Sequence, residues 1–266
     1  MNDNNAHISQ PSLALDITSD GLNYLVYLAD GSTQPVTGNV PIAPENYLHE
    51  LEEAVYSTPA LLADYHRTTI AIHSQHFALM PHELENQASE VLGASFSTIE
   101  GDVMTSPAGG GAMIACDVPT GIVAFLRRTF AQPVLLQHLA PLCDFCVKAH
   151  ALDGGCLHID MDQQQAHVVV TRDGKLLFAN TFDYRSLDDM VYFTLNVWRM
   201  SHLDSRSDKI MLSGDKEMVR ELAPQLRQWV TYAMPQVFPT QALKFGRDAI
   251  NIPFNMLLIA LYGEKV

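Results

Sequence analysis

The chain has 266 residues, of which 47% are hydrophobic and 17% charged, a composition that excludes a largely disordered protein. Its 30 acidic and 16 basic residues give a formal net charge of −14, which argues against nucleic acid and anionic membrane surfaces as partners. The start of the chain lacks the features of a signal peptide. The longest apolar run near the C-terminus, 256–262, is far shorter than the ~20 residues that cross a bilayer. We therefore expect a cytoplasmic protein with no membrane insertion and with reduced cysteines.

In chain order, the first half predicts a meander of strands and then alternating helices and strands. The meander comprises strands over 13–17, 22–28 and 33–37, with Asp30-Gly31 as a hairpin turn. Apolar residues at helical spacing over 44–56 predict a helix after it. We then expect a strand over 68–73, a helix over 81–92 that Gly93 ends, a loop over 107–111, a strand over 112–117, a helix over 120–130, a strand over 133–137 and a helix over 139–151.

The second half repeats this plan. Strands are expected over 156–161, 166–171 and 175–182, with Asp173-Gly174 as the turn, then a helix over 187–203, a strand over 209–212 and a helix over 216–226. Asp16 precedes its Asp-Gly turn by nearly the same spacing as Asp160 precedes the second one. The repeat predicts a polar tail over 1–11 and two α/β lobes with mixed sheets, over 12–152 and 153–266, with a ligand-binding cleft between them.

These residues carry a resemblance to a known superfamily. Two meanders that open on aspartate, with a Leu-Ser-Gly strand end at 212–214, resemble the actin, sugar kinase and Hsp70 superfamily with its duplicated RNase H-like lobes. Within it, the chain looks most like a bacterial family of unknown function with an actin-like ATPase fold, reminiscent of actin-like pilus-assembly proteins. The resemblance covers nearly the whole chain, and its most specific piece runs from Ile159 through Asp173-Gly174 to Leu176. It implies ATP and magnesium in the cleft, contacted by Asp16, Thr18, Ser19, Asp160, Asp162, Gln163, Ser213 and Gly214.

The chain departs from the superfamily at the two phosphate loops. Active members carry Asp-x-Gly there, because backbone amides approach phosphate oxygens only where no side chain intervenes. This chain has Thr18 and Asp162 at the glycine positions, and Gln163 and Gln164 are bulkier than the small hydroxyl residues usual beside them. An Asp162 carboxylate would repel a triphosphate unless a metal intervened. These departures argue against ATP hydrolysis and against a bound cofactor.

The same residues have structural interpretations. Asp16 and Asp160 would hold a hydrated magnesium ion if nucleotide binds, since hard cations prefer oxygen ligands; otherwise they are turn aspartates that satisfy local backbone amides. Ser213-Gly214 either lies against adenosine or is a plain strand-to-helix turn in which Asp215 caps the next helix.

Cysteine and histidine residues form one cluster with the residue types of a zinc site. Cys143, Cys146 and His150 are followed by Cys156 and His158, and zinc requires four converging ligands. The first three positions also form one apolar face of a helix, so we expect packing instead of metal.

Two further motifs have structural interpretations. Glycines 109–111 lack the Lys-Ser/Thr ending of a P-loop and predict a flexible loop. His73, His76 and His82 lie close in sequence, and His76 with an acid such as Glu83 could do general acid–base work. We expect these histidines at a strand end and loop on the surface.

Three functional hypotheses follow. The favoured one is a degenerate, pseudo-ATPase binding or scaffold module with a protein or peptide partner. The alternative is an active ATP- and magnesium-dependent phosphotransferase or ATPase. The third is a zinc-binding protein that uses the Cys143 cluster.

Overall fold

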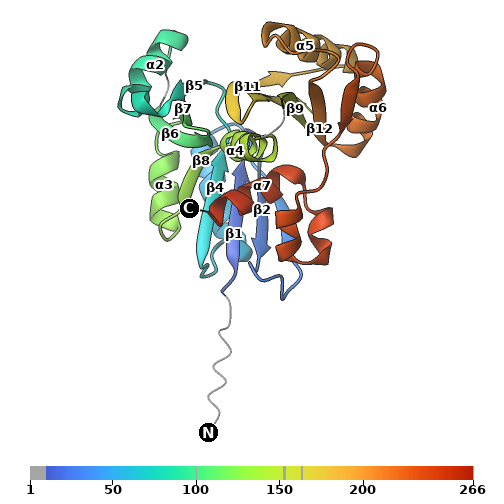
Figure 1. The fold of residues 1–266 in the computed structure, drawn as a ribbon. Helices are drawn as coiled ribbons and strands as arrows, with labels where there is room; N and C mark the ends of the chain where they lie inside the picture. The colour runs from blue at the N-terminus through green and yellow to red at the C-terminus, as the bar shows by residue number, and fades with distance from the viewer. Residues whose placement is uncertain (1–9, 100, 152–153, 163, 266) are drawn as a thin grey trace.

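A computed structural model describes residues 10–99, 101–151, 154–162 and 164–265. Within these ranges, no helix is both long and apolar enough to span a membrane. The strands of the described part form two five-stranded sheets and one three-stranded sheet. Figure 1 shows the two larger sheets with helices on their outer sides and a pair of helices, α4 and α7, near the centre.

The first sheet has the strand order β3-β2-β1-β4-β8. Its strands are β1 (Ser12–Ile17), β2 (Gly21–Tyr27), β3 (Val36–Pro41), β4 (Arg67–Ile72) and β8 (Val134–Gln137). The meander β1–β2–β3 is antiparallel, whereas β4 runs parallel to β1 and to β8. Asp16 is the next-to-last residue of the central strand β1.

The second sheet repeats this arrangement with the order β11-β10-β9-β12-β13. Its strands are β9 (Gly155–Met161), β10 (Gln165–Arg172), β11 (Lys175–Asp183), β12 (Lys209–Gly214) and β13 (Tyr232–Pro235). The meander is again antiparallel, and β12 again runs parallel to the first strand of the meander. Asp160 is the next-to-last residue of β9, as Asp16 is of β1, so the predicted duplication of mixed sheets is confirmed.

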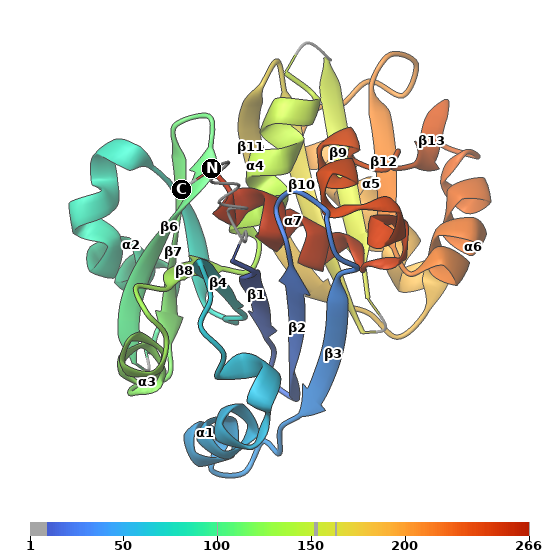
Figure 2. The ribbon, with the colours of Figure 1, turned by 90° about the horizontal axis from the view of Figure 1, so that it is seen from below.

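Helices cover both faces of each sheet. Leu13, Leu15 and Ile17 point from one face of the first sheet into a core with α1 (Tyr47–Ser57) and α3 (Ile122–Thr129). The corresponding face of the second sheet packs on α5 (Leu187–Met200) and α6 (Lys216–Leu226). The other faces meet a shared layer made of α4 (Ala140–Ala149) and α7 (Phe254–Gly263), seen side by side in Figure 2. Because side chains alternate along a strand, Asp16 and Asp160 belong to the faces that turn toward this layer.

A smaller antiparallel sheet, β5-β7-β6, extends the first lobe. It consists of β5 (Phe77–Pro81), β6 (Asp102–Gly109) and β7 (Ala112–Val118), and α2 (Ala88–Ser95) packs against it. β5 and β6 were not expected from the sequence. The predicted loop over 107–111 is instead the end of β6 and a tight turn into β7, with positive φ at all three glycines. The predicted helix over 81–92 begins as a 3-10 helix, η2 (His82–Gln87), and continues as α2 beyond Gly93.

Other elements also differ from expectation. β3 lies later than the predicted strand over 33–37, and β13 was not predicted. Both strands lie at sheet edges and are largely exposed, so their hydrophobic alternation is weak. The remaining described elements are the 3-10 helices η1 (Pro59–Leu61), η3 (Thr240–Phe245) and η4 (Arg247–Asn251). The last two lead into α7, which packs on β1 and β4 of the first sheet.

Candidate functional site

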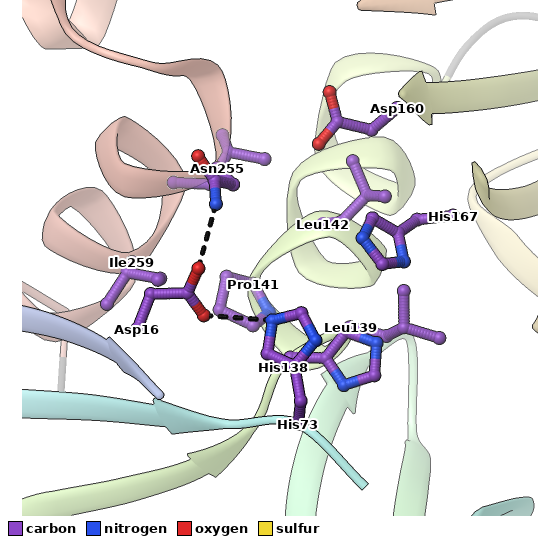
Figure 3. Close-up of a pocket in the computed structure, with 11 residues that line it drawn as sticks. Asp16, His73, His138, Leu139, Pro141, Leu142, Asp160, His167, Asn255 and Ile259 are labelled. Atoms are coloured by element: carbon purple, nitrogen blue, oxygen red, sulfur yellow. Dashed lines mark hydrogen bonds and ion pairs between the residues drawn. The ribbon is translucent and has the colours of Figure 1, made fainter. Parts of the chain in front are cut away.

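Asp16 and Asp160 line one small cavity between the two sheets (Figure 3). The cavity measures about 20 Å³, room for a single water molecule. Leu142 of α4 and Leu258 of α7 form part of its wall, so the central helix layer fills the space between the two aspartates. The duplicated strands therefore bring the two predicted aspartates to a common site, and the side chains of the helix layer leave little room there.

The Asp16 carboxylate is held by side chains from two other elements. Its Oδ1 atom lies 3.0 Å from Nε2 of His73, and its Oδ2 atom accepts a hydrogen bond of 3.0 Å from Nδ2 of Asn255. Burial by itself would lower the pKa of His73, but the Asp16 carboxylate, together with Asp162 and Asp20, outweighs burial and raises it. Asp16 is 2% exposed, and His73 and Asn255 occupy both of its oxygens. The partners of Asp16 are thus side chains of other elements, and not the local turn amides of the structural interpretation.

The Asp160 carboxylate ends a buried hydrogen-bond chain. Ser213 Oγ donates to Asp160 Oδ1 at 2.6 Å, and Nε2 of His158 lies 2.8 Å from the same hydroxyl. Because the hydroxyl proton is used on Asp160, His158 donates to Ser213. Burial, followed by the charge of His150, lowers the pKa of His158 to about 3, so this ring stays neutral. Burial raises the pKa of Asp160 to about 6, although the Ser213 bond opposes that shift.

Three histidines form a cluster beside Asp16. The rings of His73 and His138 stack at 4.0 Å, and the ring of His167 lies 5.0 Å from that of His138. Burial, then the neighbouring His73, lowers the pKa of His167 to about 4, and the same two causes lower the pKa of His138. His73 is thus the member of the cluster that takes up a proton most readily, whereas the lowered pKa values of His138 and His167 favour neutral rings.

The expected surface position of His73 is wrong, because only 18% of its side chain is exposed in this cluster. Sequence reasoning did not single out His138 or His167, since they lie far apart in the chain and carry no local motif. His76 and His82 are more exposed, as expected. The acid beside His76 is Asp117, at 3.2 Å, and not Glu83.

The chain at the first phosphate-loop position forms a turn that is held by hydrogen bonds within the turn itself. The Thr18 amide donates to the Gly21 carbonyl at 2.9 Å, and the Thr18 hydroxyl donates to Asp20 Oδ1 at 2.8 Å. The Tyr47 hydroxyl donates to the Thr18 carbonyl. Ser19 lies exposed at the tip of this turn.

At the second phosphate-loop position, the carboxylate of Asp162 accepts hydrogen bonds from amides of the same loop. Oδ1 of Asp162 accepts hydrogen bonds from the amides of Gln164, at 2.8 Å, and Gln165, at 2.6 Å. The Tyr184 hydroxyl donates to the Asp162 carbonyl, as Tyr47 does in the first lobe. Gln163 lies outside the described residues. In a phosphate-binding loop such amides point at a phosphate oxygen, whereas here a carboxylate of the same loop takes two of them.

Ser213 and Gly214 end β12 directly against β9. Gly214 has a φ of 94°, and a Cβ atom at this position would lie 1.9 Å from the Met161 carbonyl oxygen. Asp215 then caps α6, since its Oδ1 accepts from the amides of Glu217 at 2.9 Å and Met218 at 3.0 Å. The predicted cap is confirmed, and the approach of β12 to β9 explains the glycine.

The cysteine cluster packs as a helix face. Cys143 and Cys146 lie buried on α4 in an apolar core with Leu139 and Leu142, as the helical spacing predicts. Burial raises the pKa of both thiols. His158, which the metal interpretation included, bonds Ser213 instead. Over the described residues, no group of three His, Cys, Asp or Glu side chains could hold a metal ion.

A nucleotide does not fit the site in this arrangement. Pockets for small molecules occupy ~300–1,000 Å³, whereas the described residues enclose 20 Å³ between the aspartates. The carboxylate of Asp162 also occupies the amides that would receive a phosphate. The residues present do not match ATP with magnesium.

Comparisons with known proteins agree with the geometry of the fold. The family model described as "Protein of unknown function (DUF3822)" matches residues 2–232. The structure is similar to that of a Bacteroides thetaiotaomicron VPI-5482 protein with an actin-like ATPase fold and unknown function, with a TM-score of 0.76 and 18% identity over 94% of this chain and 96% of that one. It is also similar to a chain of the PilM-PilN type IV pilus biogenesis complex, with a TM-score of 0.58 and 14% identity over 95% and 98% of the two chains. No curated protein matches the chain. The predicted actin-like fold with two lobes is confirmed.

Proposed function

Because this chain belongs to the DUF3822 family, whose function is unknown, and has an actin-like ATPase fold, we propose that it is a pseudo-ATPase that binds a protein or peptide partner. It keeps the two-lobed architecture and uses it as a binding or scaffold module.

The closed state of the inter-lobe site is the observation that carries this proposal. Asp16 is engaged by His73 and Asn255, and Asp160 by Ser213. The helices α4 and α7 fill the space between the two carboxylates. A nucleotide would have to displace this packing and break these bonds at a cost in free energy, and the loop amides of Gln164 and Gln165 already bond Asp162.

The Asp162 carboxylate supports the same proposal from a second direction. It supplies a negative charge at the position where a phosphate would lie, and it bonds two loop amides. The loop is therefore stable without a ligand, and a triphosphate would meet a like charge there.

The proposed partner class draws support from the fold. The structure resembles one chain of the PilM-PilN complex, an assembly of two proteins. We infer that a protein or peptide segment also binds this chain. The alternative, an active ATP- and magnesium-dependent enzyme, is favoured by one observation, namely that Asp16 and Asp160 line a common cavity.

A thermal melt with and without excess ATP and magnesium separates the two functions. A ligand at a concentration of 100 times its Kd would stabilise the protein by about 2.7 kcal/mol, which raises the Tm by several degrees in a chain of this size. We expect no shift for the wild type or for Asp160→Ala. A rise in Tm for the wild type that Asp160→Ala abolishes would overturn the pseudo-ATPase proposal.

A further inference from the structure

A second and larger cavity runs as a groove along α4 and α7, beside the segment that follows β13. It measures about 350 Å³, within the range of pockets that bind ligands. The larger apolar side chains in its lining include Phe145, Val237, Phe238, Leu258, Leu261 and Tyr262. Pro141 and Leu258 line both this groove and the small cavity between the aspartates. The groove thus lies against the same helix layer that closes the inter-lobe site.

The rim of the groove is positively charged. Nζ of Lys148 lies 2.5 Å from Oδ1 of Asp144, and Nζ of Lys265 lies 3.0 Å from Oδ2 of the same carboxylate. Asp144 is the one acid among the described lining residues, so two ammonium groups face one carboxylate. Both lysine side chains stay about half exposed, at 56% and 47%. In a chain with a net charge of −14, these two lysines and one aspartate form a local excess of positive charge, which favours an anionic group.

A buried acceptor completes the groove. Gln236 lines it, and its Oε1 atom is buried with no hydrogen-bond partner among the described residues. The other end of this side chain is fixed, because Nε2 donates to the Val237 carbonyl at 2.9 Å. An unsatisfied buried acceptor costs free energy, which a donor from a bound molecule would recover once the Gln236 side chain turns its oxygen into the groove.

We propose that this groove binds a short peptide segment of a partner protein in which apolar side chains stand beside an acidic one. The apolar side chains would pack on Phe145, Leu261 and Tyr262, and the carboxylate would pair with Lys148 and Lys265. A fatty acid offers the same apolar and anionic chemistry but has no N–H group, whereas a peptide amide can donate to Gln236 Oε1. The proposal rests on the proposed function as a binding module and names its site.

The test uses the full chain and a phage-displayed library of random short peptides. We expect enrichment of sequences that combine apolar residues with Asp or Glu. Fluorescence polarisation then gives their affinities for the wild type and for groove variants. Val237→Asp should weaken binding roughly tenfold or more, because Val237 is an exposed apolar wall of the groove. The double variant Lys148→Gln/Lys265→Gln should also weaken binding roughly tenfold and reduce its dependence on salt.

Matched controls separate loss of the groove from loss of the fold. Val237 is 73% exposed, so Val237→Asp should melt like the wild type. Ile250→Asp makes the same kind of change at a residue that is 63% exposed and does not line the groove, and Lys175→Gln removes a lysine from β11. Both controls should bind the selected peptides with unchanged affinity.

Three results would overturn the groove assignment. Peptides that bind all variants equally would place the binding site elsewhere and leave the binding-module function standing. A library that enriches no peptide would remove the groove proposal, while the ATP melt still decides the pseudo-ATPase proposal independently. Sodium laurate that binds the wild type and not the groove variants, with no peptide enriched, would assign the groove to a lipid carboxylate.

Discussion

His138 and Thr181 join the two lobes, with Nε2 of the histidine 3.1 Å from the threonine hydroxyl. His138 follows β8 of the first sheet, and Thr181 lies on β11 of the second. Gln137 Nε2 contacts His138 Nδ1 at 2.9 Å, which directs the Nε2 proton of His138 toward Thr181. The Thr181 hydroxyl can then donate to His167 Nδ1, 3.0 Å away. A single hydroxyl therefore satisfies two neutral histidines at the junction between the lobes.

Removing that hydroxyl should weaken the junction. Thr181→Val leaves two buried ring nitrogens without a partner and is expected to lower the free energy of unfolding by about 1–3 kcal/mol. Urea unfolding of the wild type and the variant measures this change in the free energy of unfolding. Thr171→Val is the matched control, because Thr171 is buried on the adjacent strand β10 and its hydroxyl has no hydrogen-bond partner among the described residues. Thr171→Val should be neutral or stabilising, and equal losses in the two variants would contradict the role of Thr181.

The buried histidines predict acid sensitivity. The pKa of His167 is lowered to about 4, that of His158 to about 3, and that of His138 is also lowered. Between about pH 6.5 and 4 these histidines bind protons in the unfolded chain but stay neutral in the folded protein. The free energy of unfolding should therefore fall by several kcal/mol on acidification.

Other charged groups at this site act differently over that range. The pKa of His73 is raised by Asp16, with Asp162 and Asp20 contributing, so its stabilising contribution is already complete below pH 6.5. Asp160 opposes the trend, because its raised pKa lets the folded state take up a proton first. Denaturant titrations across this pH range measure the net change in the free energy of unfolding. His167→Gln should reduce the slope of that free energy against pH. A stability that is flat or rises on acidification would contradict neutral buried histidines.

The ionised Asp160 carboxylate should cost stability at neutral pH. Its pKa is raised to about 6 by burial, so Asp160→Asn is expected to raise the free energy of unfolding by about 1–3 kcal/mol at pH 7.5. The asparagine oxygen can still accept the Ser213 hydrogen bond. This gain should shrink as the pH falls below 6, because the native carboxyl then binds its own proton.

Asp16→Asn serves as the control, since it removes the partner of the cationic His73 and should destabilise the protein. Unfolding curves at the two pH values measure both variants. Asp160→Asn that destabilises at pH 7.5 would show that the charge of Asp160 is stabilised by its surroundings.

The second loop should depend on the Asp162 side chain. Asp162→Ala removes the acceptor of the Gln164 and Gln165 amides and is expected to cost about 1 kcal/mol, as loss of a capping side chain does. Asp162→Asn keeps an acceptor oxygen without the charge and should retain most of that stability. Chemical denaturation compares the two variants, and an Ala variant as stable as the wild type would rule out the carboxylate as the group that holds this loop.

Several features of this protein followed from local sequence patterns. The duplicated meander was predicted because apolar alternation and Asp-Gly turns are read over a few residues, and it located Asp16 and Asp160 at equivalent strand ends. The helical spacing of Cys143 and Cys146 likewise predicted their burial on α4. Strands β3 and β13 were misplaced or missed because edge strands bury little and leave a weak pattern.

The sequence by itself determined the two-lobed plan and showed an aspartate at position 162 where a phosphate loop needs glycine. Only the tertiary structure decided what fills the space between the lobes. His73, His138, His167 and Thr181 come from separate strands or strand ends, and α4 and α7 contact each other although they lie far apart in the chain. Such contacts depend on long-range packing, which leaves no periodic signal in the chain. The closure of the site therefore became visible only in three dimensions.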